Sequence, residues 1–259
     1  MFISARSFEE YRAMFALTEH DLSLRILDCP GGAAGFVAEA GARGTDAVAV
    51  DPQYGADRGR LGELALREIE HRHTELVDGD ADFVWTWFEG PEQYTRMRSE
   101  AARAFARDIA ARPDRYVEGS LPHLPFPDRS FDLVLSSHLL FSYGEQMDED
   151  FHREALLELV RVSRWQVRLY PLFLHTRFRR YPALEEMREA LAGYGIASRV
   201  EPVDYACDPG DQEMLVLECA DRGALPAREP DPDAARRHHD PVRWRHLDAA
   251  SERTASSEA

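Results

Sequence analysis

The stretch 24–54, LRILDCPGGAAGFVAEAGARGTDAVAVDPQY, places the strongest constraint on how this chain folds. It begins with a short apolar run that ends at Asp28 and predicts a β-strand. A Pro-Gly-Gly sequence at 30–32 then predicts a tight turn, because glycine accepts a left-handed backbone and lets a ligand approach closely. Small and apolar residues over 35–43 predict a helix, which Gly44 is suited to end.

A second buried strand is predicted over 47–50 and ends at Asp51, which completes half of a nucleotide-binding βαβ unit. In such a unit the glycine turn and the helix N-terminus face the ligand, and Asp51 is placed to accept hydrogen bonds from ribose hydroxyls. Residues 30–35 match two of the three glycines in the dinucleotide fingerprint G-x-G-x-x-G. Asp28 and Gly32 also match the S-adenosylmethionine (SAM) motif D-x-G-x-G-x-G. A tight turn that binds no ligand remains a third interpretation.

The composition indicates one soluble domain with room for an insertion or a tail. The chain has 259 residues and no apolar run of membrane-spanning length, and its first residues lack the apolar region of a signal peptide. Its three cysteines are too few and too scattered for a disulfide framework or a zinc site. No histidine spacing matches a metal-binding pattern. We therefore expect a cytoplasmic protein without a metal or a membrane partner.

The charged residues restrict the chemistry and the partners. There are 31 basic residues against 47 acidic ones, for a net charge of −16, and every basic residue is an arginine. The absence of lysine excludes a P-loop phosphate clamp and Schiff-base chemistry. Because phosphate contacts need a basic face, the acidic balance argues against nucleic acid as the main partner. The sequence leaves the oligomeric state open.

A helix is predicted before the glycine-rich unit, over 7–22. Ser7 is a suitable N-cap, and Glu10 lies at the spacing of a capping box. Tyr11 belongs to the apolar face of this helix, where it either helps to cover one edge of the sheet or borders the ligand.

After the second strand, residues 55–115 are too long for an ordinary connection and predict a helical insertion. Two amphipathic runs in this segment predict two helices above the carboxyl edge of the sheet. Aromatic residues around Trp87 either wall a substrate pocket or form a small core of the insertion itself. The insertion is expected to act as a mobile lid or, alternatively, as a rigid subdomain that shapes the pocket.

The rest of the chain predicts an α/β, Rossmann-like fold. Apolar runs predict further strands at 116–118, 131–136, 166–172, 198–203 and 214–219. Helical periodicity predicts helices at 152–162 and 183–193. The first five strands alternate with helices and the last two are adjacent. We therefore expect a seven-stranded, mostly parallel sheet with helices on both faces and antiparallel final strands.

The composition changes after residue 220. Residues 221–259 are rich in Pro, Asp, Ala and Arg and lack apolar periodicity. This predicts a disordered acidic and polar tail after a single domain at 1–220. The tail is expected to be dispensable for stability and for ligand binding.

Residues 121–141, LPHLPFPDRSFDLVLSSHLLF, carry a resemblance to a known family. They resemble the L-P-F-x-D-x-S-F-D-x-V segment of small-molecule methyltransferases related to the ubiquinone and menaquinone C-methyltransferases. Over roughly 1–220 the chain is similar to class I SAM-dependent methyltransferases, and in particular to an uncharacterised bacterial branch. The resemblance implies S-adenosyl-L-methionine as the cofactor and transfer of its methyl group to an unidentified small-molecule acceptor by in-line displacement.

Departures from the family pattern leave two other functions open. Pro30 replaces the first motif glycine, residues 119–121 replace a usual acidic contact to adenine, and 162–167 lacks the usual proline-glycine-glycine turn. A SAM-binding or regulatory protein without turnover is one alternative. A NAD-binding oxidoreductase is the other, and the absence of a Tyr-x-x-x-Lys dyad disfavours it.

The resemblance and the predicted strand ends assign the candidate site residues, because ligands bind outside the carboxyl ends of parallel strands. The expected SAM contacts are Asp28, Pro30, Gly31, Gly32, Asp51, Pro52, Gly119, Ser120, Leu121 and Ser136. The candidate base is His138, followed by Tyr143 and His123, although a structural role for His138 is equally consistent with the sequence. The candidate substrate contacts are Trp87, Tyr94 and Arg168, the last of which would pair with an anionic acceptor.

Overall fold

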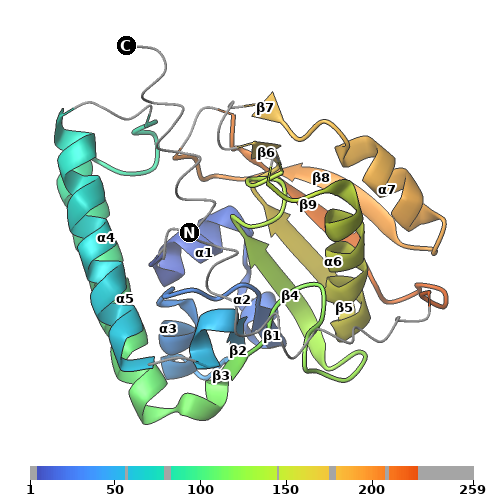
Figure 1. The fold of residues 1–259 in the computed structure, drawn as a ribbon, viewed down its shortest axis with the longest axis horizontal. Helices are drawn as coiled ribbons and strands as arrows, with labels where there is room; N and C mark the ends of the chain where they lie inside the picture. Colours follow the sequence, from blue (N-terminus) through green and yellow to red (C-terminus); the bar gives the residue numbers. More distant parts are fainter. Residues whose placement is uncertain are drawn as a thin grey trace.

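The computed structural model describes residues 5–55, 58–78, 83–144, 146–174, 179–207 and 210–226 (Figure 1). Within them, a seven-stranded sheet has the order β3-β2-β1-β4-β5-β9-β8. Its strands are β1 Arg25–Asp28, β2 Asp46–Asp51, β3 Tyr116–Glu118, β4 Phe131–Ser137, β5 Ser163–Tyr170, β8 Ala197–Pro202 and β9 Glu213–Glu218. The strands from β3 to β5 in this order are parallel, whereas β9 is antiparallel to both β5 and β8. The predicted Rossmann-like sheet is confirmed.

Helices cover both faces of this sheet (Figure 1). Successive strand residues point to opposite faces, so Ile26 belongs to one apolar core and Leu27 to the other. The first core includes residues of α1, α3, α4 and α5, and the second includes residues of α6 and α7. The helices are α1 Phe8–Met14, α2 Glu19–Leu22, α3 Phe36–Ala42, α4 Arg58–Asp78, α5 Pro91–Ala111, α6 Glu149–Val162 and α7 Leu184–Ala192.

The single helix predicted over 7–22 is wrong, because the segment forms two helices, α1 and α2. Ser7 begins α1 with the predicted capping box: its hydroxyl accepts the Glu10 N–H at 3.2 Å, and its own N–H donates to the Glu10 carboxylate at 2.8 Å. Thr18 and Asp21 form a second capping box that begins α2. Between the helices Ala16 has a φ of 47°, a left-handed conformation that interrupts a helix.

Two features near the end of β4 and β5 were not predicted. The short strands β6 Phe173–Leu174 and β7 Arg179–Arg180 pair in antiparallel fashion after β5. Strands of this length give no periodic signal. Helix α6 begins at Glu149, before the predicted start at 152, because Asp148 accepts the Phe151 N–H at 2.8 Å and so caps the helix.

The insertion forms the predicted pair of helices, but α4 and α5 lie beside the sheet and not above its carboxyl edge (Figure 1). Helix α5 packs so closely on the start of α3 that a Cβ on Gly35 would lie 2.9 Å from the Ala101 backbone. Residues 83–90, which precede α5, extend to the carboxyl edge. There the Val84 N–H donates to the carbonyl of Cys207, in the loop that follows β8, at 2.8 Å.

The folded domain continues beyond the boundary predicted at residue 220. The Gly223 N–H donates to the Tyr194 carbonyl at 2.9 Å, and Leu225 packs against the core that contains α6 and α7. From residue 227 onward the predicted tail lies outside the described residues. No helix in the described part of the chain is long and apolar enough to cross a membrane.

Candidate active site

Hydrogen bonds hold the glycine-rich turn after β1 against the end of β2. The Asp51 carboxylate accepts the Gly32 N–H at 3.0 Å through Oδ2 and the Gln53 N–H at 2.9 Å through Oδ1. The Gly31 N–H donates to the Val50 carbonyl at 3.0 Å. The acid that ends β2 is therefore buried directly beside the turn, as the βαβ unit predicts.

Tyr54 explains why position 31 is a glycine. The Tyr54 hydroxyl donates to the Gly32 carbonyl at 2.7 Å, and its side chain is fully buried. A Cβ on Gly31 would lie 2.5 Å from the Tyr54 hydroxyl oxygen and 2.7 Å from the Ala49 Cβ. Since van der Waals contacts between carbon atoms lie near 3.5–4.0 Å, any side chain at this position would displace the turn.

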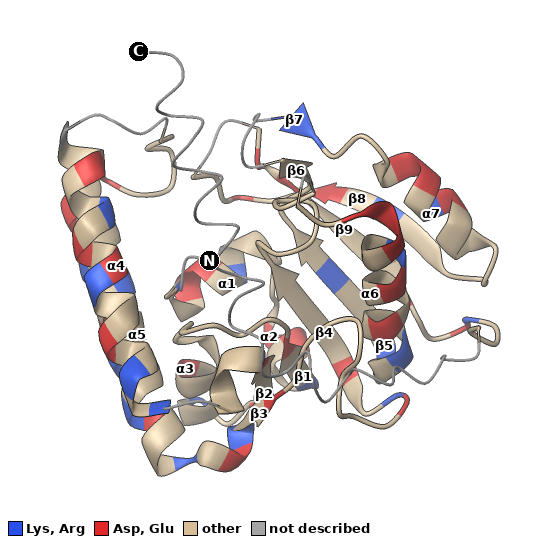
Figure 2. Ribbon diagram, in the orientation of Figure 1, with Lys and Arg blue, Asp and Glu red and all other residues tan. Residues whose placement is uncertain are grey.

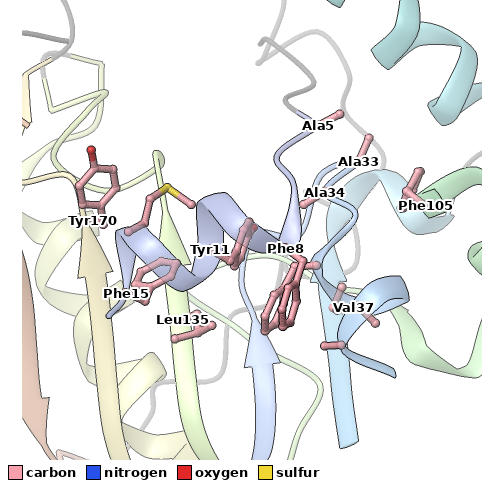
Figure 3. Close-up of a cluster of buried hydrophobic side chains, with 14 of the residues drawn as sticks. Ala5, Phe8, Tyr11, Phe15, Ala33, Ala34, Val37, Phe105, Leu135 and Tyr170 are labelled. Atoms are coloured by element: carbon pink, nitrogen blue, oxygen red, sulfur yellow. The ribbon is translucent and has the colours of Figure 1, made fainter. Parts of the chain in front are cut away.

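Tyr11 of α1 covers Asp28 at the carboxyl end of β1. Its hydroxyl lies 3.0 Å from each of the two Asp28 carboxylate oxygens. Its ring stacks on Phe36 of α3 with 4.6 Å between the ring centroids, and Figure 3 shows Tyr11 between Phe8 and Phe15. The hydroxyl supplies a hydrogen-bond donor to this buried carboxyl group.

Asp28 and Asp51 give the site two buried carboxyl groups. Burial raises the pKa of Asp51 to about 6, although the N–H donors of Gln53 and Gly32 act to lower it. Burial also raises the pKa of Asp28 well above its usual range, because the hydrogen bond from Tyr11 lowers it only in part and the charge of Asp51 raises it further. A positively charged ligand would favour the ionised form of both groups.

The ends of β3 and β4 lie at the same edge of the sheet. Gly119 follows β3, and its N–H lies 3.4 Å from the Asp51 carbonyl. Ser136 is buried near the end of β4, which pairs with β1 through Leu135 and Asp28. The remaining expected SAM contacts continue from these strand ends, namely Pro30, Pro52, Ser120 and Leu121. Contact of each of them with a ligand stays a prediction.

His138 directly follows β4 in an unusual backbone conformation. Its φ is 52°, in the left-handed region that residues other than glycine seldom adopt. Its N–H donates to the Tyr170 carbonyl at 2.8 Å, and the two rings have centroids 5.3 Å apart. Strained backbone is frequent at functional sites. Tyr143 lies farther along the same loop, with its N–H 3.3 Å from the Leu139 carbonyl, and the base role of both residues stays a prediction.

Two of the predicted substrate residues, Trp87 and Tyr94, pack within an aromatic cluster of the insertion. The Trp87 ring lies 5.0 Å from the ring of Tyr205, in the loop after β8. The Tyr94 hydroxyl accepts a hydrogen bond from Arg98 at 2.7 Å, and Tyr94 is buried. These contacts favour the interpretation that the aromatic residues form a small core, here shared with the loop after β8.

A buried ion pair connects the insertion to α1. Arg98 lies 2.7 Å from the Glu10 carboxylate, with side chains 8% and 0% exposed, respectively. The Tyr205 hydroxyl donates to the same carboxylate oxygen at 2.7 Å. Burial alone would raise the pKa of Glu10, but the Arg98 charge holds it below its usual value. Because this network joins α5, α1 and the loop after β8, it favours a rigid subdomain over a mobile lid.

Arg168, the third predicted substrate residue, is occupied by protein partners. On β5 its guanidinium donates to Asp21 at 2.9 Å, to the Phe15 carbonyl at 2.8 Å and to the Gln166 side chain at 3.1 Å. The side chain is 9% exposed. These contacts favour a structural role, in which Arg168 ties α2 to the sheet, over the predicted pairing with an anionic substrate.

A protein family matches the part of the chain that contains β3, β4 and β5. Residues 88–170 match the family described as methyltransferase domain. This range includes the LPF segment at 124–126 and the ends of strands that border the site. The parallel order β3-β2-β1-β4-β5 followed by the antiparallel β9 agrees with the fold that the resemblance implied. This match supports the resemblance to the class I SAM-dependent methyltransferases. It also supports S-adenosyl-L-methionine as the cofactor that the resemblance implies.

Individual similar proteins add little about the acceptor. Uncharacterized protein MJ0045 of Methanocaldococcus jannaschii is 26% identical over 213 residues, which cover 82% of this chain and 93% of that protein. Magnesium protoporphyrin IX methyltransferase of Synechocystis PCC 6803, solved with bound SAM, is 12% identical, with 82% and 77% coverage and a TM-score of 0.41. A possible histamine N-methyltransferase of Thermotoga maritima is 16% identical, with 82% and 87% coverage and a TM-score of 0.41. Sequence identities and TM-scores this low support no conclusion about the substrate.

The residues at the carboxyl edge fit this cofactor. SAM supplies a methyl group on a positively charged sulfur, and so presents a cation to a site that contains two buried carboxyl groups. Each Asp51 oxygen accepts one backbone N–H and retains a lone pair that a ribose hydroxyl can occupy. Asp51 and the glycine turn would therefore hold the ribose end, and Asp28 would lie near positive charge.

Proposed function

We propose that this methyltransferase transfers a methyl group to a small-molecule acceptor by direct in-line displacement. The observation that carries the proposal is the hydrogen bond from the Gly32 N–H to the Asp51 carboxylate, beside a second buried acid, Asp28. This arrangement offers ribose acceptors, a close backbone approach and negative charge at one strand edge, which together match an adenosine with a cationic substituent.

The protein's part in such a reaction is mainly to align the acceptor and to exclude water, because the methyl group is already activated. Ser136 and His138 follow β4, next to the β1 turn, and would border the acceptor. His138 or Tyr143 would accept a proton only where the attacking atom carries a proton that must leave.

Formation of S-adenosylhomocysteine from SAM, measured by mass spectrometry with a pool of cell metabolites as acceptors, tests the proposal. Binding of SAM is measured by calorimetry in parallel. Asp51→Ala should weaken SAM binding by about 1.5–3 kcal/mol, the range for a hydrogen bond to a charged group. Asp46→Ala is the matched control, because Asp46 lies at the exposed start of the same strand. Equal SAM affinities in the two variants would contradict the ribose assignment.

A SAM-binding protein without turnover is the second candidate. The departures at Pro30 and at 119–121 support it. SAM binding without formation of S-adenosylhomocysteine from any acceptor in the pool would favour this candidate. A NAD-binding oxidoreductase would instead show a melting temperature that rises with NAD and not with SAM, since a ligand specific to the folded state stabilises it.

A further inference from the structure

A cavity of about 830 Å³ lies at the carboxyl side of the sheet, and none of its described lining residues is an expected SAM contact. One side of it is formed by Gly144 and residues 146–150, which follow β4. The other side is formed by Leu174, Arg179 and residues 181–183, which follow β5. Strands β4 and β5 are parallel neighbours in the sheet, with Ser137 paired to Tyr170. The cavity therefore occupies the kind of position in which parallel sheets bind ligands, one strand away from the glycine turn.

Negative charge predominates around this cavity. The first residues of α6 and its N-cap bring the carboxylates of Asp148, Glu149 and Asp150 to its rim, against a single guanidinium, that of Arg179, among the described lining residues. Figure 2 shows acidic residues in the first turn of α6 and basic residues in β7 opposite. The negative charge of these carboxylates exceeds the positive partial charge at the N-terminus of α6, because a helix dipole is equivalent to only about half a unit charge at each end. The rim thus favours cations over anions.

Interactions within α6 occupy only two of these three carboxylates. Asp148 caps α6 through the Phe151 N–H at 2.8 Å, and Asp150 pairs with Arg153 at 2.6 Å. Glu149 forms neither an ion pair nor a hydrogen bond with any described residue. Its carboxylate is exposed at the rim. It is therefore available to a ligand.

An aromatic wall adds a second feature that suits a cation. The Tyr181 ring, 5% exposed, packs against Phe141 and His152 with centroids 5.3 Å and 4.9 Å apart. Burial and the charges of Glu149 and Asp148 raise the pKa of Tyr181, so these carboxylates act on the space beside the ring. Aromatic rings attract ammonium and guanidinium groups, and more strongly where the contact is shielded from water.

We propose that this cavity binds the methyl acceptor and that the acceptor carries an amine or another cationic group, which the Glu149 carboxylate and the Tyr181 ring recognise. The inference rests on the proposed function and deepens it by assigning a substrate class. It differs from the expectation of an anionic acceptor at Arg168, whose guanidinium is occupied by Asp21 and Gln166.

Two probes of matched shape and opposite charge test the proposal, 2-phenylethylamine and 3-phenylpropionate. Their binding to the full chain saturated with S-adenosylhomocysteine is measured by ligand-observed NMR at pH 7. The amine should bind at least tenfold more tightly than the carboxylate. Glu149→Gln should weaken binding of the amine about threefold, as expected for one exposed charge pair. Glu149→Gln/Asp150→Asn should weaken it further.

Glu154→Gln is the matched control, because Glu154 is an exposed acid on the same helix that does not line the cavity. It should leave binding of the amine unchanged. The inference is overturned if the carboxylate binds as tightly as the amine, or if Glu149→Gln behaves like Glu154→Gln. Calorimetry with S-adenosylhomocysteine on the same samples separates the two claims. Absence of S-adenosylhomocysteine binding contradicts the proposed function, whereas charge-selective binding of the amine supports the cation site in either case.

Discussion

The affinity for SAM should fall as the pH is lowered from 7 to 5, because Asp51 takes up a proton in this range. The Asp51 carboxyl is buried, and burial raises its pKa to about 6. Ribose hydroxyls donate hydrogen bonds to the ionised carboxylate, so a protonated Asp51 must first lose its proton. The apparent affinity is then reduced by the fraction of protein in the ionised state.

A pKa of about 6 sets the size of the effect. The ionised fraction of Asp51 is about ten-elevenths at pH 7 and about one-eleventh at pH 5, so the apparent Kd should rise about tenfold, or about 1.4 kcal/mol. An ordinary α-amino group has a pKa of about 8, so the amino group of SAM stays charged over this range. Among the groups that face Asp51, burial raises the pKa of Cys29 and of Tyr54, and both remain neutral. Asp28 is a further titratable neighbour of Asp51.

Calorimetric titration with SAM at pH 5, 6 and 7, at constant ionic strength, measures this dependence. Asp51→Asn cannot ionise at this position. It should bind SAM more weakly at pH 7 and retain only the part of the pH dependence that comes from Asp28. The reasoning is refuted if the wild-type affinity is flat from pH 5 to 7, or if Asp51→Asn shows the same slope as the wild type.

The raised pKa of Asp51 also fixes the sign of a stability change. A group whose pKa is higher in the folded state contributes stability that is complete below its unfolded pKa, near 3.8, and is lost as the pH rises through about 6. The shift of 6 − 3.8 = 2.2 pKa units corresponds to about 3 kcal/mol. Asp51→Asn should therefore gain stability relative to the wild type, by up to this amount, as the pH rises from 4 to 7. Urea unfolding in the absence of SAM measures it.

Three further predictions concern the scaffold. Arg98→Met should destabilise the fold by about 3–5 kcal/mol in urea unfolding, because it removes the guanidinium that pairs with the buried Glu10 carboxylate. Glu10→Gln/Arg98→Met should recover part of the loss, and equal stabilities of the two variants would contradict this account. Gly31→Ala should abolish tight SAM binding, because the added Cβ would collide with Tyr54 and Ala49. Gly44 has a left-handed backbone with open space around it, so Gly44→Ala should cost about 1–2 kcal/mol of stability and keep the SAM affinity. A chain ending at residue 226 should keep its melting temperature and SAM affinity, and a clear drop in either would mean that the tail makes stabilising contacts.

The architecture of the sheet was predictable because it depends on local patterns. The glycine-rich unit and the buried strand at 131–136 are coded in short apolar runs between turn residues, and the structure confirms them. The break at Ala16 was missed because the helical pattern of apolar residues continues across it. The second capping box at Thr18 was a readable signal. The β6 and β7 pair was missed because its strands have only two residues each.

The site was predictable only where residues lie next to one another in the βαβ unit. The contact between Asp51 and the glycine turn follows from that unit. The contact between Tyr11 and Asp28 depends on the packing of α1 across the sheet, which no local pattern specifies. The same limit applies to Arg168, whose partner Asp21 is distant in sequence. Charged residues with distant partners are therefore the least reliable substrate predictions.

A crystal structure of the full chain with S-adenosylhomocysteine tests the central claim most directly. The account predicts that the ribose hydroxyls lie within hydrogen-bond distance of the Asp51 carboxylate, with the backbone of Gly31 and Gly32 against the ligand and the sulfur directed toward the end of β4. Ligand density elsewhere, for example in the cavity beside Tyr181, or an Asp51 carboxylate without contact to the ligand, would contradict it.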